Sequence, residues 1–388
     1  MTEPDRMITP QSKLPGVGTT IFAVISQLAA DHGALNLGQG FPDFDGPPAL
    51  RDRVAHYMNS GHNQYAPMPG VPALRQAIAG KVATLYGRDT DADSEVTVTP
   101  GATEALFCAI NALVRPGDEV IVFDPAYDSY DPATVLAGGI CRHLPLKPSD
   151  YRPDWAAVRD AITDRTRLIV LNSPHNPTGA ILTADDLDEL EAVLDGTDIF
   201  VLSDEVYEHI VFSDEGHQSI LRRPALARRG VAVSSFGKTY HCTGWKVGYA
   251  IAPPAIMAEI RKVHQYVTFA VNTPVQMALA DIMTTQPEHH LELPAFYRTK
   301  RDRFRAEVAE SRFRLLPCAG TYFQLLDYSD IADISDGDMA RRLIEDHGIA
   351  TVPISVFYES PPEARLLRAC FAKDDATLAR AGEILRAV

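Results

Sequence analysis

The hydrophobic pattern of the chain alternates between short apolar runs and longer segments with helical spacing. Residues 102–114 have the spacing of a helix, and turn signals such as Pro116-Gly117 separate the elements. Strands that alternate with helices are typical of an α/β protein with a mainly parallel sheet and helices on both faces. The apolar, β-branched runs predict strands at residues 95–99, 119–123, 168–171, 199–202, 231–233 and 247–251.

The pattern changes near residue 290. A long charged helical pattern covers residues 291–314, strand-like pieces follow at 321–326 and 368–372, and residues 375–388 predict a last helix. This region is predicted to be a smaller α+β domain. The predicted parts are an N-terminal arm at 1–44 that packs with the small domain, a large domain at 45–290 and the small C-terminal domain at 291–388.

Composition narrows the class of protein. The chain has 388 residues, of which 46% are hydrophobic and 22% charged, as in an ordinary globular protein. The net charge of -15 opposes binding to nucleic acid or to an anionic membrane surface. Five scattered cysteines without a paired spacing predict reduced thiols. Residues 1–13 are polar and no apolar run reaches spanning length, so we expect a cytoplasmic protein.

Polar residues and glycines follow the predicted strands at the points where they end. Examples are Gly101, Asp124, Asn176, Asp204 and Lys238. In open α/β sheets, ligands bind in the crevice outside the carboxyl ends of the strands. We therefore expect these residues to share one site.

Residues 234–248 carry the most informative motif. Ser235 and Lys238 follow a strand, and a second cation, Lys246, comes eight positions later beside Thr243-Gly244. A lysine amine can bond with an aldehyde cofactor, while a serine and a second cation hold its anionic group. A surface lysine in a polar loop is the alternative, and the flanking motif favours the functional interpretation.

Two further segments can contact the ring of such a cofactor. Asp204 ends a strand and can pair with a protonated pyridine nitrogen, while Tyr207 can donate to a phenolic oxygen. Asn176, in Asn176-Pro177-Thr178-Gly179, can donate to the same oxygen or simply belong to a turn. Tyr127 can stack on the ring or serve as a packing aromatic.

Anion sites are predicted at two other places. Gly101, Ala102 and Thr103 join a strand to a helix, where small residues let backbone amides approach a phosphate; Ser235 and Lys246 complete this cradle. Arg368 interrupts an apolar strand and suits a bidentate carboxylate, with a structural salt bridge as the alternative. No spacing of histidines or cysteines resembles a metal site.

In this order the motifs resemble those of the fold-type I, pyridoxal-phosphate (PLP) class I/II aminotransferases over nearly the whole chain. The resemblance is closest to the branch that contains bacterial methionine aminotransferase and the kynurenine aminotransferase/glutamine transaminase K group. It rests on residues 36–44, 63–65, 203–209, 231–253, 259–281 and 370–373. It implies a PLP-dependent aminotransferase with Lys238, Asp204 and Tyr207 as catalytic residues.

The resemblance also implies roles that spacing does not show. Tyr65 is expected to reach the cofactor phosphate of the opposite subunit, which makes the enzyme a homodimer with shared sites. Gly38 is expected beside the substrate carboxylate opposite Arg368. Phe357 and, across the interface, Phe269 are expected to wall an apolar pocket.

The chain departs from the kynurenine-acting members at Thr103, where they tend to have an aromatic residue. This leaves less stacking area for a large aromatic ring and favours methionine or glutamine. The expected donor is a neutral L-amino acid, methionine first and also glutamine or an aromatic amino acid, and the expected acceptor is a 2-oxo acid. Kynurenine–oxoglutarate transaminase or cysteine-S-conjugate β-lyase activity is the alternative. A PLP-binding regulatory module is disfavoured, because the chain has no room for a basic DNA-binding domain.

Overall fold

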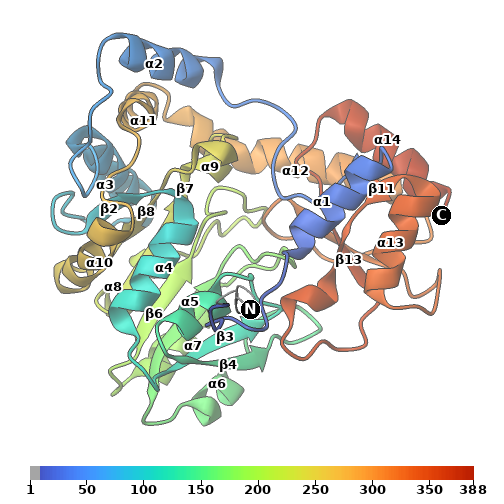
Figure 1. Ribbon diagram of the computed structural model, residues 1–388, viewed down its shortest axis with the longest axis horizontal. Helices are drawn as coiled ribbons and strands as arrows, with labels where there is room; N and C mark the ends of the chain where they lie inside the picture. The colour runs from blue at the N-terminus through green and yellow to red at the C-terminus, as the bar shows by residue number, and fades with distance from the viewer. Residues whose placement is uncertain (1–8) are drawn as a thin grey trace, which may run out of the picture.

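The computed structural model describes residues 9–388, so residues 1–8 of the predicted N-terminal arm lie outside the described residues. Two sheets dominate the described chain and lie in different parts of the molecule (Figure 1). The larger sheet has seven strands: β2 (Val96–Thr99), β3 (Glu119–Asp124), β4 (Ile140–Pro145), β5 (Thr166–Asn172), β6 (Phe200–Asp204), β7 (Gly230–Ser235) and β8 (Gly248–Ile251).

The strand order of the large sheet is β2-β8-β7-β6-β5-β3-β4. Every neighbouring pair is parallel except those of β8, which runs antiparallel to β2 and β7. All the apolar runs that predicted strands in this region are strands. The sequence prediction missed β4, because this edge strand is half-exposed and contains Arg142, His143 and Pro145 in place of an apolar run.

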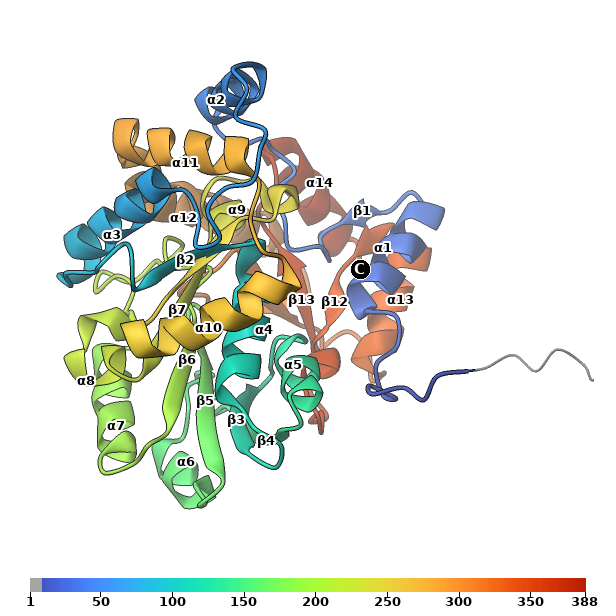
Figure 2. The same ribbon diagram turned by 60° about the vertical axis from the view of Figure 1, so that its left-hand side comes forward.

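Helices cover both faces of the large sheet, as predicted for this fold class (Figure 2). Alternate residues of one strand face opposite sides: Ile121 packs in one core cluster, while Val120 and Val122 pack in the other. The second cluster contains α4 (Gly101–Leu113), α5 (Tyr130–Leu136) and α10 (Pro254–Val267). The first contains α2 (Pro48–Asn59), α3 (Pro72–Tyr86), α6 (Trp155–Ala161), α7 (Ala184–Leu194), η1 (Ile220–Arg222), α8 (Pro224–Ala227) and α11 (Thr273–Thr285).

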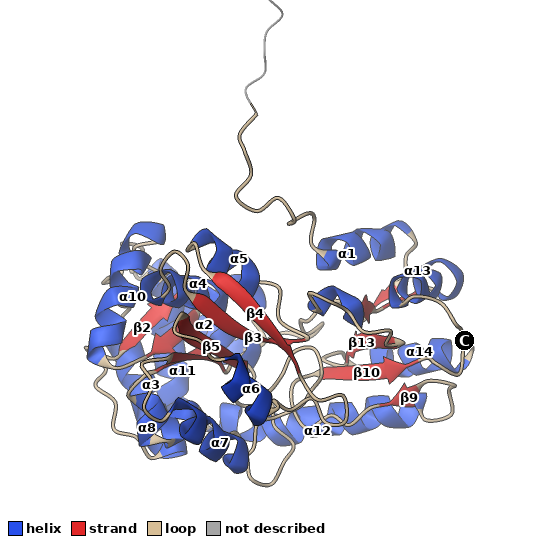
Figure 3. Cartoon of the chain, turned by 90° about the horizontal axis from the view of Figure 1, so that it is seen from below, coloured by secondary structure: helices blue, strands red, loops and turns tan. Residues whose placement is uncertain are grey.

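The smaller, four-stranded sheet has the order β12-β13-β10-β9, and all its pairs are antiparallel. Its strands are β9 (Arg314–Leu315), β10 (Phe323–Asp327), β12 (Val352–Pro353) and β13 (Leu366–Cys370). The helices beside it are α12 (Glu288–Val308), α13 (Asp336–His347), η3 (Ile354–Phe357) and α14 (Asp375–Arg386). Helix α12 runs beneath both sheets in Figure 3.

The N-terminal segment packs with this smaller part. Helix α1 (Ile21–Asp31) precedes β1 (Leu35–Asn36), which pairs in parallel with β11 (Ile349–Ala350). Ile25 and Leu37 belong to the same core cluster as the smaller sheet. The domain boundaries at residues 44/45 and 290/291 stay a prediction.

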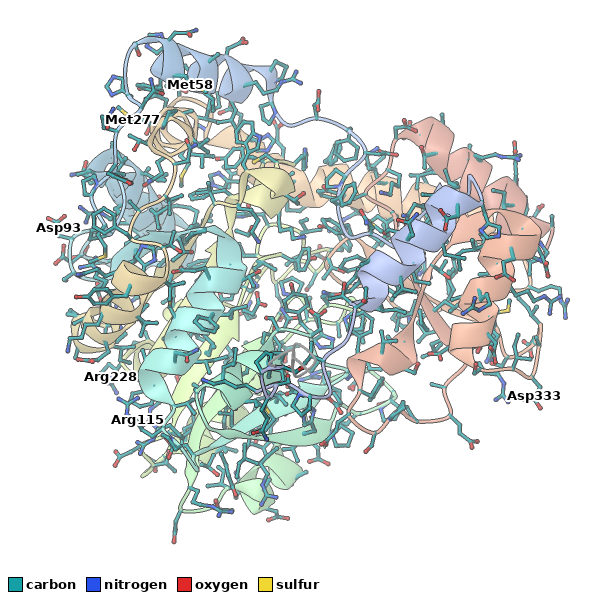
Figure 4. The ribbon with its side chains drawn as sticks, viewed as in Figure 1. Met58, Asp93, Arg115, Arg228, Met277 and Asp333 are labelled. Atoms are coloured by element: carbon teal, nitrogen blue, oxygen red, sulfur yellow. The ribbon has the colours of Figure 1, made fainter. Side chains whose placement is uncertain are left out.

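Much of the acidic charge lies at the exterior. The side chains of Asp93 and Asp333 are 85% and 89% exposed, and both lie at the outer surface in Figure 4. Ion pairs made by such exposed carboxylates contribute little to the free energy of unfolding. The five cysteines are free thiols. Within residues 9–388, no helix has the length and apolar character needed to cross a membrane.

Candidate active site

A cavity of about 240 Å³ lies at the carboxyl ends of the parallel strands, where the sequence predicts the shared site. Strands β5, β6 and β7 end beside it, and α4 begins there. The predicted cofactor and substrate residues that line it are Gly101, Ala102, Thr103, Tyr127, Asn176, Asp204, Tyr207, Ser235, Lys238, Lys246 and Arg368. Asp124 does not line this cavity, because its carboxylate binds His143 and the backbone N–H of Glu359.

Lys238 is held by a compact turn after β7. The turn consists of α9 (Phe236–Thr239) and η2 (Thr243–Trp245), and it ends at Lys246, whose φ of 53° is left-handed. A Cβ on Gly237 would lie 2.9 Å from the Cα of Thr243, so only glycine lets these two segments approach so closely. This tight turn places both Lys238 and Lys246 at the cavity.

The amine of Lys238 has neutral partners. Its Nζ lies 2.9 Å from the hydroxyl oxygen of Tyr322 and 3.1 Å from the carbonyl oxygen of Gly40. Burial lowers the pKa of Lys238 to about 8, and the nearby cations Arg368 and Lys246 act in the same direction. A substantial fraction of the amine is consequently neutral and nucleophilic near pH 7 to 8.

Asp204 is a buried carboxylate without a cation in hydrogen-bonding contact among the described residues. Its Oδ2 accepts from the Tyr130 hydroxyl at 2.8 Å, and its Oδ1 accepts from the N–H of Val206 at 3.3 Å. Burial raises the pKa of Asp204 to about 6, although Tyr130 opposes the rise. Its unmet charge suits a protonated ring nitrogen.

The turn from β2 into α4 forms a cradle for an anion. Gly101 has a φ of 74°, and a Cβ there would lie 3.2 Å from the Nζ of Lys246. The first backbone N–H groups of α4 point out of the helix end, where the helix dipole favours negative charge. A helix end, a lysine and the hydroxyl of Ser235 together match the donor set of a phosphate site.

Arg368 is 1% exposed and has no carboxylate within ion-pairing distance among residues 9–388. Its Nη1 donates to the Oδ1 of Asn176 at 2.7 Å, and its Nη2 donates to the carbonyl oxygen of Gly38 at 2.8 Å. Its Nε is buried without a partner. The structural salt bridge considered from the sequence is absent in this described chain, so the guanidinium is available to an anionic ligand.

Three aromatic rings enclose the same guanidinium. Its carbon lies 4.0 Å from the ring centre of Phe323, 5.1 Å from that of Phe22 and 5.3 Å from that of Phe357. Gly38 and Phe357, two predicted substrate residues, therefore lie beside Arg368 although they do not line the cavity.

Tyr65 and Phe269 lie elsewhere. Their rings pack against each other at 5.6 Å, and the residues are 85% and 45% exposed. Neither lines the cavity of this chain. Sequence reasoning assigned both to the neighbouring subunit's site, and the single chain leaves that assignment a prediction.

The structure adds residues that sequence reasoning missed or gave another role. Gly40 and Asn172 line the cavity and belong to segments already noted for their motifs. Tyr130 begins α5 three positions after Tyr127, and its hydroxyl donates to Asp204; its nearness to the Tyr127 motif is the signal that could have found it. Phe22 and Leu106 carried no recognisable signal.

The sequence predicts no metal site. The structure brings together two groups of side chains of the types that bind metal ions. In one, the Nδ1 of His264 lies 2.7 Å from the Oε1 of Glu104, with Cys108 adjacent. In the other, the Nε2 of His143 lies 3.1 Å from the Oδ2 of Asp131, with Cys141 adjacent. Hydrogen bonds join donor atoms within both groups, and the absence of a metal site stays a prediction.

Comparison with known proteins adds a family model and close relatives. The model of aminotransferase class I and II matches residues 32–385. Methionine aminotransferase of Escherichia coli K12 is 56% identical over 98% of each chain. Its crystal structure has a TM-score of 0.97 and covers 98% of this chain and 100% of that one.

More distant relatives share the same architecture. The structure of N-succinyldiaminopimelate aminotransferase from Mycobacterium tuberculosis is 38% identical with a TM-score of 0.94, and covers 98% of this chain and 100% of that one. Kynurenine–oxoglutarate transaminase of Dictyostelium discoideum is 34% identical over 97% of this chain and 95% of its own.

Proposed function

The chain belongs to the class I and II aminotransferases, and we propose that it transfers the amino group of a neutral L-amino acid, methionine first, to a 2-oxo acid. The predictions of the family, the fold class and the PLP dependence are confirmed. The observation that carries the proposal is the arrangement of Lys238, Asp204 and the unpaired Arg368 around one cavity.

The residues of the cavity fit PLP. The Gly101 turn, Ser235 and Lys246 would hold its phosphate, Asp204 would face its ring nitrogen, and Tyr127 would lie against the ring. PLP, when bound, supplies an aldehyde that bonds with amino groups and a ring that withdraws electrons from them. The raised pKa of Asp204 fits this assignment, because burial leaves the carboxylate in need of a cationic partner.

The chain's own residues then bind the substrate and move one proton. Arg368 holds the substrate carboxylate with its guanidinium, which Asn176 and Gly38 fix in place. The neutral amine of Lys238 accepts the proton from the substrate's α-carbon and later returns it. Tyr207 and Asn176 are assigned to the ring oxygen, as the sequence predicts.

The walls of the cavity favour a neutral side chain of moderate size. Phe22, Leu106 and Thr103 line it, and Thr103 is smaller than an aromatic residue. The 56% identical methionine aminotransferase supports methionine as donor. A kynurenine–oxoglutarate transaminase is the second candidate for activity, favoured by the 34% identical relative of that name. Cysteine-conjugate β-lyase activity stays a prediction.

We also propose a homodimer in which Tyr65 and Phe269 complete the partner's site. Three aromatic residues near each other in the chain's surface support this: Tyr65 and Tyr266 are 85% and 86% exposed, and Phe269 is 45% exposed. Exposed aromatic clusters of this kind mark interfaces. The mass of the protein in solution tests the assembly. A cytoplasmic location stays a prediction from the sequence.

The visible spectrum of the purified, PLP-loaded protein tests the activity. We expect L-methionine alone to bleach the yellow colour and a 2-oxo acid to restore it, because each half of the transfer changes the state of the cofactor. L-Kynurenine is the matched alternative donor. A protein that stays yellow with both would contradict the proposed donors, and a protein that takes up no PLP would contradict the assignment of the site.

A further inference from the structure

Tyr322 is a buried residue next to Lys238 to which the proposed function assigns no role. Tyr322 is 0% exposed, and it immediately precedes β10. Its hydroxyl donates to the carbonyl oxygen of Gly40 at 2.6 Å and accepts from the Nζ of Lys238 at 2.9 Å. The hydroxyl of Tyr322 therefore links the amine of Lys238 to the backbone carbonyl of Gly40 through hydrogen bonds.

The backbone at Gly40 is fixed at the same place. A Cβ on Gly40 would lie 2.8 Å from the Cζ of Phe323, so glycine is required for this loop to pack against that ring. The carbonyl of Gly40 is in turn 3.1 Å from the Nζ of Lys238. The amine thus meets two oxygen acceptors, one from Tyr322 and one from Gly40, both held by packing.

The number of acceptors matches the neutral form of the amine. A neutral amine has two N–H hydrogens and one lone pair, whereas an ammonium has three N–H hydrogens. With both hydrogens donated to Tyr322 and Gly40, the lone pair of Lys238 has no competing protein donor in the described chain. The two protein acceptors therefore equal in number the two hydrogens of the neutral amine.

We propose that Tyr322 is a positioning residue that holds the freed amine of Lys238 with its lone pair directed at the substrate's proton. This rests on the proposed function, in which Lys238 accepts that proton. The hydroxyl acts as a neutral acceptor, since burial raises the pKa of Tyr322 well above its usual value. The titratable and charged groups that surround Lys238 are Asp204, Arg368, Lys246, Tyr207 and Cys370.

The test replaces the hydroxyl and keeps the ring. In Tyr322→Phe the aromatic contacts with Tyr207 and Tyr297 remain, so the protein is expected to fold, and thermal unfolding checks this. We expect kcat of the PLP-loaded enzyme to fall about 10-fold to 100-fold with KM little changed, because a misplaced base slows only the proton transfer. Tyr297→Phe is the matched control, since its buried hydroxyl has no partner.

A second readout does not depend on turnover. The rate at which the cofactor-free protein captures added PLP, followed by absorbance against pH, reports the fraction of neutral Lys238. We expect the midpoint to move to lower pH in Tyr322→Phe but not in Tyr297→Phe, because a lost acceptor destabilises the ammonium more than the neutral amine.

The outcomes separate this proposal from the proposed function. An unchanged midpoint, or a raised KM with unchanged kcat, would overturn the positioning role and leave Tyr322 a structural residue that supports the Gly40 loop. If the wild-type enzyme transaminates no tested donor, the proposed function fails, while the capture midpoint still shows whether Tyr322 holds the amine.

Discussion

Two lysines of this protein, the buried Lys81 and the half-buried Lys238, have opposite surroundings. Lys81 donates to the carboxylate of Glu208 at 2.6 Å and to the hydroxyl of Tyr249 at 2.5 Å. Among residues 9–388, Lys238 has only the uncharged oxygens of Tyr322 and Gly40 within hydrogen-bonding distance. Both lie largely inside the protein, and they differ in whether a carboxylate touches the amine.

Two buried carboxyl groups, those of Glu208 and Asp204, show the same contrast. Burial by itself raises the pKa of a carboxyl group, but Lys81 and the hydroxyl of Ser234 hold the pKa of Glu208 well below its usual value. Asp204 has no such cation in contact in the part of the chain that the structure describes, and burial raises its pKa to about 6. A satisfied buried ion pair is structural, whereas buried charges kept apart are reactive. This difference favours Lys238 over Lys81 as the reactive lysine, independently of the sequence motif.

The largest expected effect comes from Lys238→Met. Turnover should fall by at least about 10⁴-fold, because Lys238 is the residue proposed to bond the cofactor and move the proton. The free energy of unfolding of the cofactor-free protein should change little, since no carboxylate loses a contact partner. Transamination kinetics and urea unfolding measure the two quantities. Residual turnover near the wild-type level would remove Lys238 from the mechanism.

The same substitution at the other lysine should have the reverse effect. Lys81→Met leaves the carboxylate of Glu208 buried without its cation, and the free energy of unfolding should fall by about 3–5 kcal/mol. Turnover per folded molecule should stay close to wild type. If urea unfolding shows no loss, the Lys81–Glu208 pair is not the structural counterpart of the active site.

The smallest expected effect is a pH-dependent one at Asp204. The pKa of Asp204 is higher in the folded state than in the unfolded state, so ionisation of this carboxyl group favours unfolding at pH 7. This effect disappears as the pH falls from 6 toward 4, because the group becomes protonated in both states. Asp204→Asn should therefore stabilise the cofactor-free protein by about 1 to 3 kcal/mol at pH 7, with the difference shrinking in that window.

Urea unfolding of both proteins at several pH values checks this expectation. The stability contributed by Glu208 has the opposite sign, because its carboxyl pKa is depressed and its contribution is lost at low pH. A wild-type protein more stable than Asp204→Asn at pH 7 would mean that Asp204 is satisfied in the cofactor-free state, and the contrast with Glu208 would fail.

The sequence alone predicted most of the residues that line the cavity. Lys238, Lys246 and Ser235 lie within one turn after a strand, and Gly101, Ala102 and Thr103 lie within another. Such groups could be predicted because residues of one turn at the end of a strand stay close to one another in the folded chain. The main strands of the large sheet were predictable for a similar reason, since buried strands are continuous apolar runs.

The tertiary structure decided what periodicity and motifs do not encode. Gly40 and Tyr322 are separated from Lys238 by 198 and 84 positions, and only folding brings their oxygens to its amine. Phe22 reaches Arg368 from a helix with weak periodicity, and β4 pairs at an edge without an apolar run. The pKa values of Lys238 and Asp204 depend on burial and on which charges touch, so they follow from the packed structure and not from local sequence.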